Sequence, residues 1–158
     1  MTASRGASWL TLLLAQGCTR PPQGAPGHRL DERLVECAPW QPWPAGSGFA
    51  TCSLSRREVV FGRAATVTLV RGARGVEGWM FAWGRCDDAT RAALRRAVRG
   101  YYGLDAGGEV YQQWDDAEVL RLDERGGECS LVVAGPRFGP AYVARELARG
   151  LGAILRVH

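Results

Sequence analysis

The chain has 158 residues, a length that fits one domain with a single hydrophobic core. Hydrophobic residues make up 46% of it and charged residues 23%, a balance that excludes wholesale disorder. The formal charge of +4 comes from the two ends, because residues 30–135 hold 13 Arg against 15 Asp and Glu. Proteins that bind nucleic acids concentrate positive charge on the folded body, so we expect no nucleic-acid partner.

The first residues are typical of a signal sequence. Arg5 precedes an apolar run at residues 9–15, which is too short to span a bilayer but fits the hydrophobic region of a signal peptide. The sequence therefore predicts a signal peptide over residues 1–17.

The segment that ends at Cys18 resembles a bacterial lipobox, in which a small residue precedes a cysteine whose thiol receives a diacylglyceryl group. Gly17 and Cys18 fit this pattern, whereas Ala15 and Gln16 depart from the usual leucine and small residue. The resemblance implies that Cys18 carries a lipid and that this lipid attaches the protein to a membrane.

Two other interpretations of the first residues stay open. Residues 15–17 also form a small-x-small site for an ordinary signal peptidase, which cuts at the same bond and releases a soluble protein. Alternatively, residues 9–15 are a buried part of the domain. The Pro/Gly-rich residues that follow favour export, because they are typical of a flexible tether over residues 18–29 before a single domain over residues 30–158.

The cysteine count supports export independently. Assigning Cys18 to the lipid leaves an even set of four, which suits two disulfides in an oxidising compartment. Of the three possible pairings we favour Cys37–Cys52 and Cys86–Cys129, because the first encloses a Pro/Gly/Trp loop and the second connects a helix start to a strand. In the chain-entropy model the first disulfide stabilises the fold by roughly 3 kcal/mol and the second by roughly 4 kcal/mol, because each closes a loop in the unfolded chain.

Metal and redox chemistry are not indicated by these cysteines. No two of them have the C-x2-C spacing of a zinc site or a redox pair, so we predict no metal and no cofactor. Cys86 lies before Asp87 and Asp88 at a predicted helix start, where a thiolate can be stabilised. We favour a structural disulfide there over a reactive thiol.

A Trp/Pro loop over residues 39–44 is the first candidate for binding a partner. Trp40 and Trp43 are held between prolines, which gives a recognition surface of low conformational entropy. The alternative is that the loop packs as a lid over one end of the core.

The middle of the chain predicts a β-hairpin. Residues 64–70 alternate Thr with Val and Leu, and a Gly-rich turn leads into a second strand at residues 76–83. A short strand at residues 58–61 is possible before them. Alternation places three aromatic side chains on one face of the second strand, namely Trp79, Phe81 and Trp83. This row either lies under the helices or forms an exposed patch that binds a partner.

A helix follows this hairpin. Asp87 or Asp88 can cap its start, and Gly103 stands where a left-handed C-cap is expected. One face carries Leu94, Val98 and Tyr101. A separate stripe carries Arg91, Arg95 and Arg99, with Asp87 placed to pair with Arg91.

The last third repeats this order. Residues 117–122 and 129–134 predict a second hairpin, and Pro140 suits the first position of a second helix with an apolar stripe of Val143, Leu147 and Leu151. The predicted fold class is therefore α+β, with an antiparallel sheet of about four to five strands, two helices on one face, a ββα unit repeated twice, and disulfide cross-links.

No catalytic residue is predicted. The only histidines are His28 in the tether and His158 at the last position, so no Ser/His or Cys/His pair is available in the body. The acidic pairs at residues 87–88 and 115–116 point apart and are better explained by capping and turn formation.

The order of several landmarks resembles that of short uncharacterised lipoproteins of proteobacteria. These landmarks are Cys37, Cys52, Phe61-Gly62, Tyr102-Gly103 and Trp114, whereas Cys86 and Cys129 are additions to that layout. The class has no agreed activity, so the resemblance implies an envelope lipoprotein and no particular function. With the lipobox and the two aromatic candidate surfaces, we expect a non-catalytic protein on the periplasmic side of an outer membrane that binds a protein or envelope polymer. A soluble secreted inhibitor or accessory factor, and an enzyme with an unrecognised site, are the alternatives.

Overall fold

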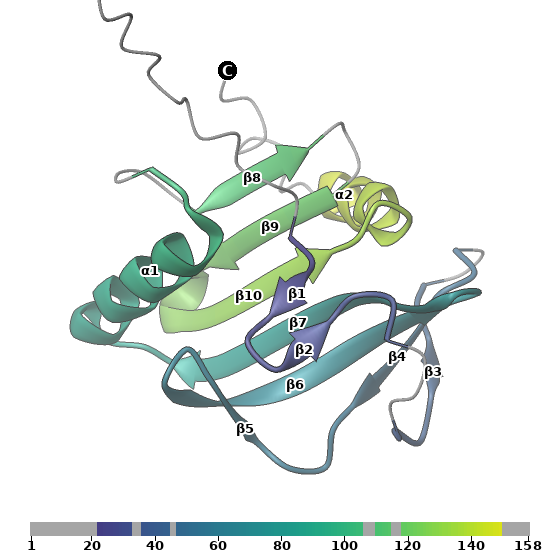
Figure 1. Ribbon diagram of the computed structural model, residues 1–158, viewed down its shortest axis with the longest axis horizontal. Coiled ribbons are helices and arrows are strands. Elements are labelled where there is room, and N and C mark those ends of the chain that lie inside the picture. The colour runs from purple at the N-terminus through teal and green to yellow at the C-terminus, as the bar shows by residue number, and fades with distance from the viewer. Residues whose placement is uncertain (1–21, 33–35, 45–46, 106–109, 115–117, 150–158) are drawn as a thin grey trace, which may run out of the picture.

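The computed structural model describes residues 22–32, 36–44, 47–105, 110–114 and 118–149 (Figure 1). Its described part is mostly strand, with two helices. One antiparallel sheet has the strand order β3-β4-β6-β7-β10-β9-β8, and β5 pairs with β6 beside β4. The strands of this sheet are β3 Gln41–Pro42, β4 Ala50–Ser53, β5 Glu58–Val60, β6 Arg63–Gly72, β7 Gly75–Arg85, β8 Tyr111–Trp114, β9 Glu118–Asp123 and β10 Glu128–Ala134.

The long hairpin β6–β7 forms the centre of the sheet and confirms the predicted pair of strands. Its register runs from Thr66 opposite Ala82 to Gly72 opposite Gly75. The alternating apolar and polar residues of β6 form a strand because period two places one set of side chains in the core. The sheet has more strands than the four to five expected, because short strands such as β3 and β4 carry little hydrophobic periodicity.

The two faces of the sheet each carry a hydrophobic core. The larger core contains Phe81 and Leu131, together with Leu94 and Val98 of the first helix. The smaller core contains Val132 and, from the second helix, Phe138 and Tyr142. Since Leu131 and Val132 are consecutive strand residues, the two cores lie on opposite faces.

The first helix, α1 Asp88–Tyr102, is confirmed with both of its predicted caps. The Asp87 side chain accepts a hydrogen bond from the Thr90 N–H at 2.7 Å, and Gly103 adopts the left-handed conformation with a φ of 68°. Arg91 pairs with Asp88 at 2.6 Å rather than with Asp87, because the Asp87 side chain turns back to cap the helix.

The second helix, α2 Phe138–Ala148, lies on the face opposite α1, so the expectation of two helices on one face is wrong. The strands β7 and β10 are apolar on both faces, and each face therefore needs its own cover. Pro140 is the third residue of this helix rather than the first. The repeat of a ββα unit stays a prediction.

The buried stripe of α2 also differs from the predicted one. Phe138, Tyr142 and Glu146 are buried, whereas Leu147 is 49% exposed. Glu146 is buried because it forms an ion pair with the buried Arg121 of β9 at 3.0 Å. Leu151, the third member of the predicted stripe, lies outside the described residues.

The segment expected to be a flexible tether forms a second, two-stranded sheet from residue 24 onward. The strands β1 Gly24–Ala25 and β2 His28–Arg29 pair across a turn at Pro26 and Gly27, and Gly27 has the positive φ of 76° that such a turn requires. Figure 1 shows this hairpin crossing the sheet, and Ala25 belongs to the larger core. Tertiary packing therefore overrides the Pro/Gly composition.

Both predicted disulfides are present. Cys37 is bonded to Cys52 of β4, with their Cα atoms 6.0 Å apart. Cys86 is bonded to Cys129 of β10, with a Cα separation of 5.9 Å, and this bond connects the start of α1 to the sheet.

Candidate functional site

The aromatic row of β7, predicted as a candidate partner-binding face, is buried. Trp79, Phe81 and Trp83 are 2%, 0% and 7% exposed. The indole N–H of Trp79 donates to the Arg29 carbonyl at 3.0 Å, so part of this row holds the β1–β2 hairpin on the sheet. The row is a core element and is not available to a partner.

The two tryptophans of the Trp/Pro loop pack on different cores, Trp40 on the larger and Trp43 on the smaller. Trp43 packs edge-to-face on Phe138 of α2 with ring centroids 5.1 Å apart, and the Arg145 guanidinium lies 4.1 Å from the Trp43 ring centroid. Phe138 is fully buried. Trp43 therefore acts as a lid over the smaller core.

Trp40 lies on a cleft at the edge of the sheet. Its half-buried ring is covered by the Arg71 guanidinium, 4.3 Å from the ring centroid. The cleft has a volume of about 400 Å³ and is lined by Trp40, Pro42, Gly48, Phe49, Ala50, Arg71, Gly72 and Ala73. An aromatic ring beside a guanidinium suits recognition of a planar, apolar or carboxylate group.

The edge strand β3 limits how a partner can bind at this cleft. Pro42 has no backbone N–H, so it cannot donate to an added strand. Contact through side chains is therefore favoured over extension of the sheet.

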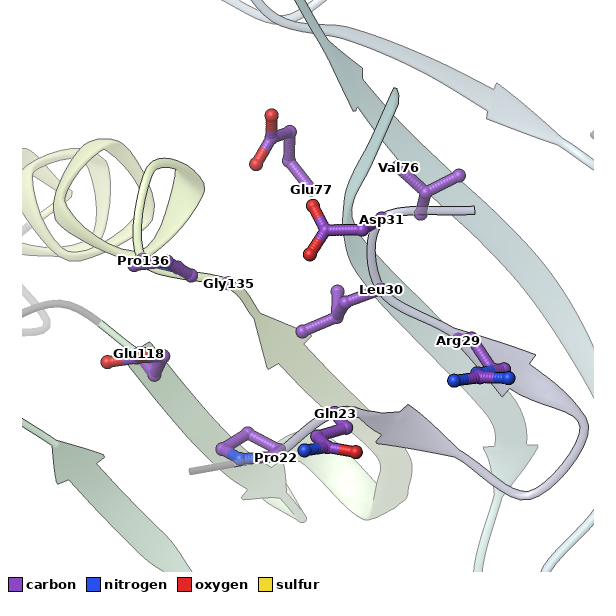
Figure 2. A pocket seen from close by; sticks show the side chains of 10 residues that line it. All are labelled: Pro22, Gln23, Arg29, Leu30, Asp31, Val76, Glu77, Glu118, Gly135 and Pro136. Atoms are coloured by element: carbon purple, nitrogen blue, oxygen red, sulfur yellow. The ribbon is translucent and has the colours of Figure 1, made fainter. Parts of the chain in front are cut away.

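Two further clefts flank the β1–β2 hairpin, and neither was predicted from the sequence. One has a volume of about 530 Å³ and the other about 580 Å³, and both are lined by Pro22, Gln23 and Arg29. Figure 2 shows the first of them, where Glu118 comes from β9 and Asp31 from the segment that follows β2. With Glu77, which also lines this cleft, three carboxylates face one guanidinium, that of Arg29.

A β-bulge supplies an ionic network beside this first cleft. Val70 pairs with Gly78 and Arg71 with Val76, so Glu77 is the extra residue of β7. The buried Glu77 carboxylate accepts a 2.7 Å hydrogen bond from Arg137, whose pKa this bond raises. Arg137 also approaches Asp31 at 3.4 Å, so the network joins the hairpin, the sheet and α2.

His28 is committed to the structure on both sides of its ring. Nδ1 lies 2.8 Å from the Pro26 carbonyl oxygen and Nε2 lies 2.7 Å from the Glu58 carboxylate. Its buried ring also packs edge-to-face on Trp79 and Phe81. These contacts tie the β1–β2 hairpin to β5 and to the aromatic row of β7.

Two tyrosine hydroxyls, those of Tyr102 and Tyr142, have raised pKa values. Burial raises the pKa of Tyr102, whose hydroxyl donates to the Gly24 carbonyl at 2.8 Å, and raises the pKa of Tyr142 to about 12. Within the described ranges, no group of three or more His, Cys, Asp or Glu side chains is placed to hold a metal ion.

The predicted lipid site, Cys18, lies outside the described residues. None of the helices that the structure describes is long and apolar enough to cross a membrane. The chain matches no protein-family model, no curated protein and no solved structure.

Proposed function

We propose that the chain is an exported, non-catalytic protein of the cell envelope. In this proposal a lipid on Cys18 attaches it to the membrane, on the periplasmic side of the outer membrane of a Gram-negative cell. Its folded domain binds a protein or an envelope polymer at the cleft beside Trp40.

The pairing of the four body cysteines is the observation that carries the export proposal. Disulfides persist in oxidising compartments such as the periplasm and are rare in the cytosol. Both bonds form between residues that the folded sheet brings together, so these four cysteines pair with one another and Cys18 is the fifth of the sequence. A lipid on Cys18 accounts for this odd number.

The difference between the two loop tryptophans supports the binding proposal. Trp43 contacts the buried Phe138 and packs on the smaller core, so its burial is explained by packing. Trp40 also packs on the larger core, and in addition it lines an open cleft with the exposed Arg71 and Ala73 at its rim. Large aromatic rings at such positions dominate the energy of many interfaces.

The binding proposal is tested by photo-crosslinking in intact envelopes. A benzophenone amino acid replaces the exposed Gln41, which lies between the two tryptophans, and a control protein carries it at the exposed Ala144 of α2. We expect a specific adduct from position 41 that is absent from position 144. Trp40→Ala abolishes the adduct, whereas Trp43→Phe retains it because a phenyl ring preserves the packing on Phe138.

The folding of each variant is measured separately, so that loss of the adduct is not confused with unfolding. A urea unfolding curve must show that the Trp40→Ala protein is fully folded in the buffer used for crosslinking. An adduct that survives Trp40→Ala in the folded protein contradicts the proposed site.

A further inference from the structure

The folded domain begins much closer to Cys18 than the composition of the chain indicates. Pro22 is buried, and the Leu30 N–H donates to the Gln23 carbonyl at 2.9 Å. The hydroxyl of Tyr102 holds the Gly24 carbonyl at 2.8 Å. The connection between Cys18 and the fold is therefore four residues long (22 − 18) instead of the twelve expected for residues 18–29.

A connection of this length restricts the orientation of a lipid-anchored domain. Four residues span at most about 14 Å when fully extended. A globular domain of about 130 residues has a radius of gyration near 14 Å, which corresponds to a sphere of roughly 36 Å in diameter. The part of the domain around Pro22 must then stay near the bilayer, and the opposite side cannot reach it.

From this geometry we propose that the surface around Pro22, made of the exposed Gln23, Arg29 and Tyr101, lies on the phospholipid headgroups. This inference rests on the proposed lipid at Cys18. These three residues and the buried Pro22 line the cleft of about 580 Å³ between the β1–β2 hairpin and the end of α1.

Tyr101 gives this membrane-facing surface a suitable contact. It is 53% exposed and is one of three large hydrophobic side chains that are exposed in the described part of the chain, with Val59 and Leu147. Its ring packs edge-to-face on Phe61 and Tyr102, at centroid distances of 5.6 and 4.9 Å, so it is held in place. Tyrosine is enriched at membrane–water interfaces because its ring is apolar and its hydroxyl is polar.

Charge does not select this surface. Arg29 is exposed, but the exposed Glu32 lines the same cleft, so attraction to anionic lipids is offset. The short connection and Tyr101 are what favour the bilayer. The helix α2 lies on the other face of the sheet, which directs the exposed Ala144 and Leu147 away from the membrane.

The test uses the full-length lipidated protein in vesicles of phosphatidylethanolamine with phosphatidylglycerol. A benzophenone amino acid replaces Tyr101 in one protein and Ala144 in the control, and the lipid on Cys18 is first verified by mass spectrometry. After irradiation we expect phospholipid adducts at position 101 and none at position 144. A lipidated protein with no adduct at position 101, or with equal adducts at both positions, overturns the inference and leaves the anchor intact.

A longer connection separates the effect of the tether from an accidental contact. Twelve Gly and Ser residues inserted before Pro21 extend the connection from four to sixteen residues, which lowers the local concentration of the surface at the bilayer roughly eightfold. We expect the adduct yield at position 101 to fall by a similar factor. An unchanged yield overturns the role of the short connection, and a protein without lipid on Cys18 overturns both this inference and the proposed function.

Discussion

Asp87 shows how one side chain fixes the start of α1. Hydrogen bonds to Thr90 lower the pKa of Asp87 from its ordinary value of 3.8. The folded state therefore favours the carboxylate over the acid. This stabilisation is fully present above pH 3.8 and is lost as the pH falls through the lowered pKa of the folded state.

Substitution of Asp87 tests this effect. Asp87→Asn retains an oxygen that accepts from the Thr90 N–H, so we expect a near-normal urea midpoint at neutral pH and a smaller loss at about pH 3 than in wild type. Asp87→Ala removes the acceptor and lowers the midpoint already at neutral pH. Equal acid sensitivity of wild type and Asp87→Asn would show that the cap does not titrate.

At the scale of elements, the β1–β2 hairpin depends on contacts far along the chain. Ala25 and His28 pack on the larger core, and the hydroxyl of Tyr102 satisfies the Gly24 carbonyl. A Cβ at Gly24 would clash with the His28 carbonyl, so this glycine serves close strand pairing rather than flexibility. The hairpin is thus held by several independent contacts.

Tyr102→Phe tests whether the Tyr102 hydroxyl holds the hairpin. Loss of this buried hydrogen bond leaves the Gly24 carbonyl unpaired, which we expect to cost about 1–2 kcal/mol. Hydrogen exchange measured by mass spectrometry should show faster exchange in residues 22–30, with little change in β9 and β10. Tyr101→Phe, at the neighbouring exposed position, is the control, and equal exchange in the two variants would contradict the assignment.

Local signals predicted some elements and could not predict others. The alternation in β6 and the caps at Asp87 and Gly103 depend on neighbouring residues, so they were visible in the sequence. The hairpin at residues 24–29 was not visible in the sequence, because it is held by a distant residue. The indole N–H of Trp79, fifty positions along the chain, donates to the Arg29 carbonyl. The faces covered by the two helices were also undecided, since both faces of β7 are apolar.

The candidate site was predictable to a similar extent. Trp40 was found because prolines flank it, whereas the buried state of Phe81 depends on the hairpin that covers it. The surface around Pro22 left no sequence signal, because Gln23 and Tyr101 meet only in the folded chain.

In the whole molecule, the two faces of the sheet have different surroundings. The β1–β2 hairpin lies on one face, α2 covers the other, and the cleft of Trp40 lies at the sheet edge. The disulfide Cys86–Cys129 connects the start of α1 to β10. Such a layout allows the domain to rest on a membrane while the sheet edge stays accessible to a partner.

The most direct test of this account is the mass of the N-terminal peptide of the mature protein, isolated from the membrane fraction of cells. The account predicts a peptide that begins at Cys18 and carries a diacylglyceryl group, and it predicts that Cys18→Ala prevents this modification. A mature peptide that begins at Cys18 without lipid, or one that retains residues before Cys18, would contradict it.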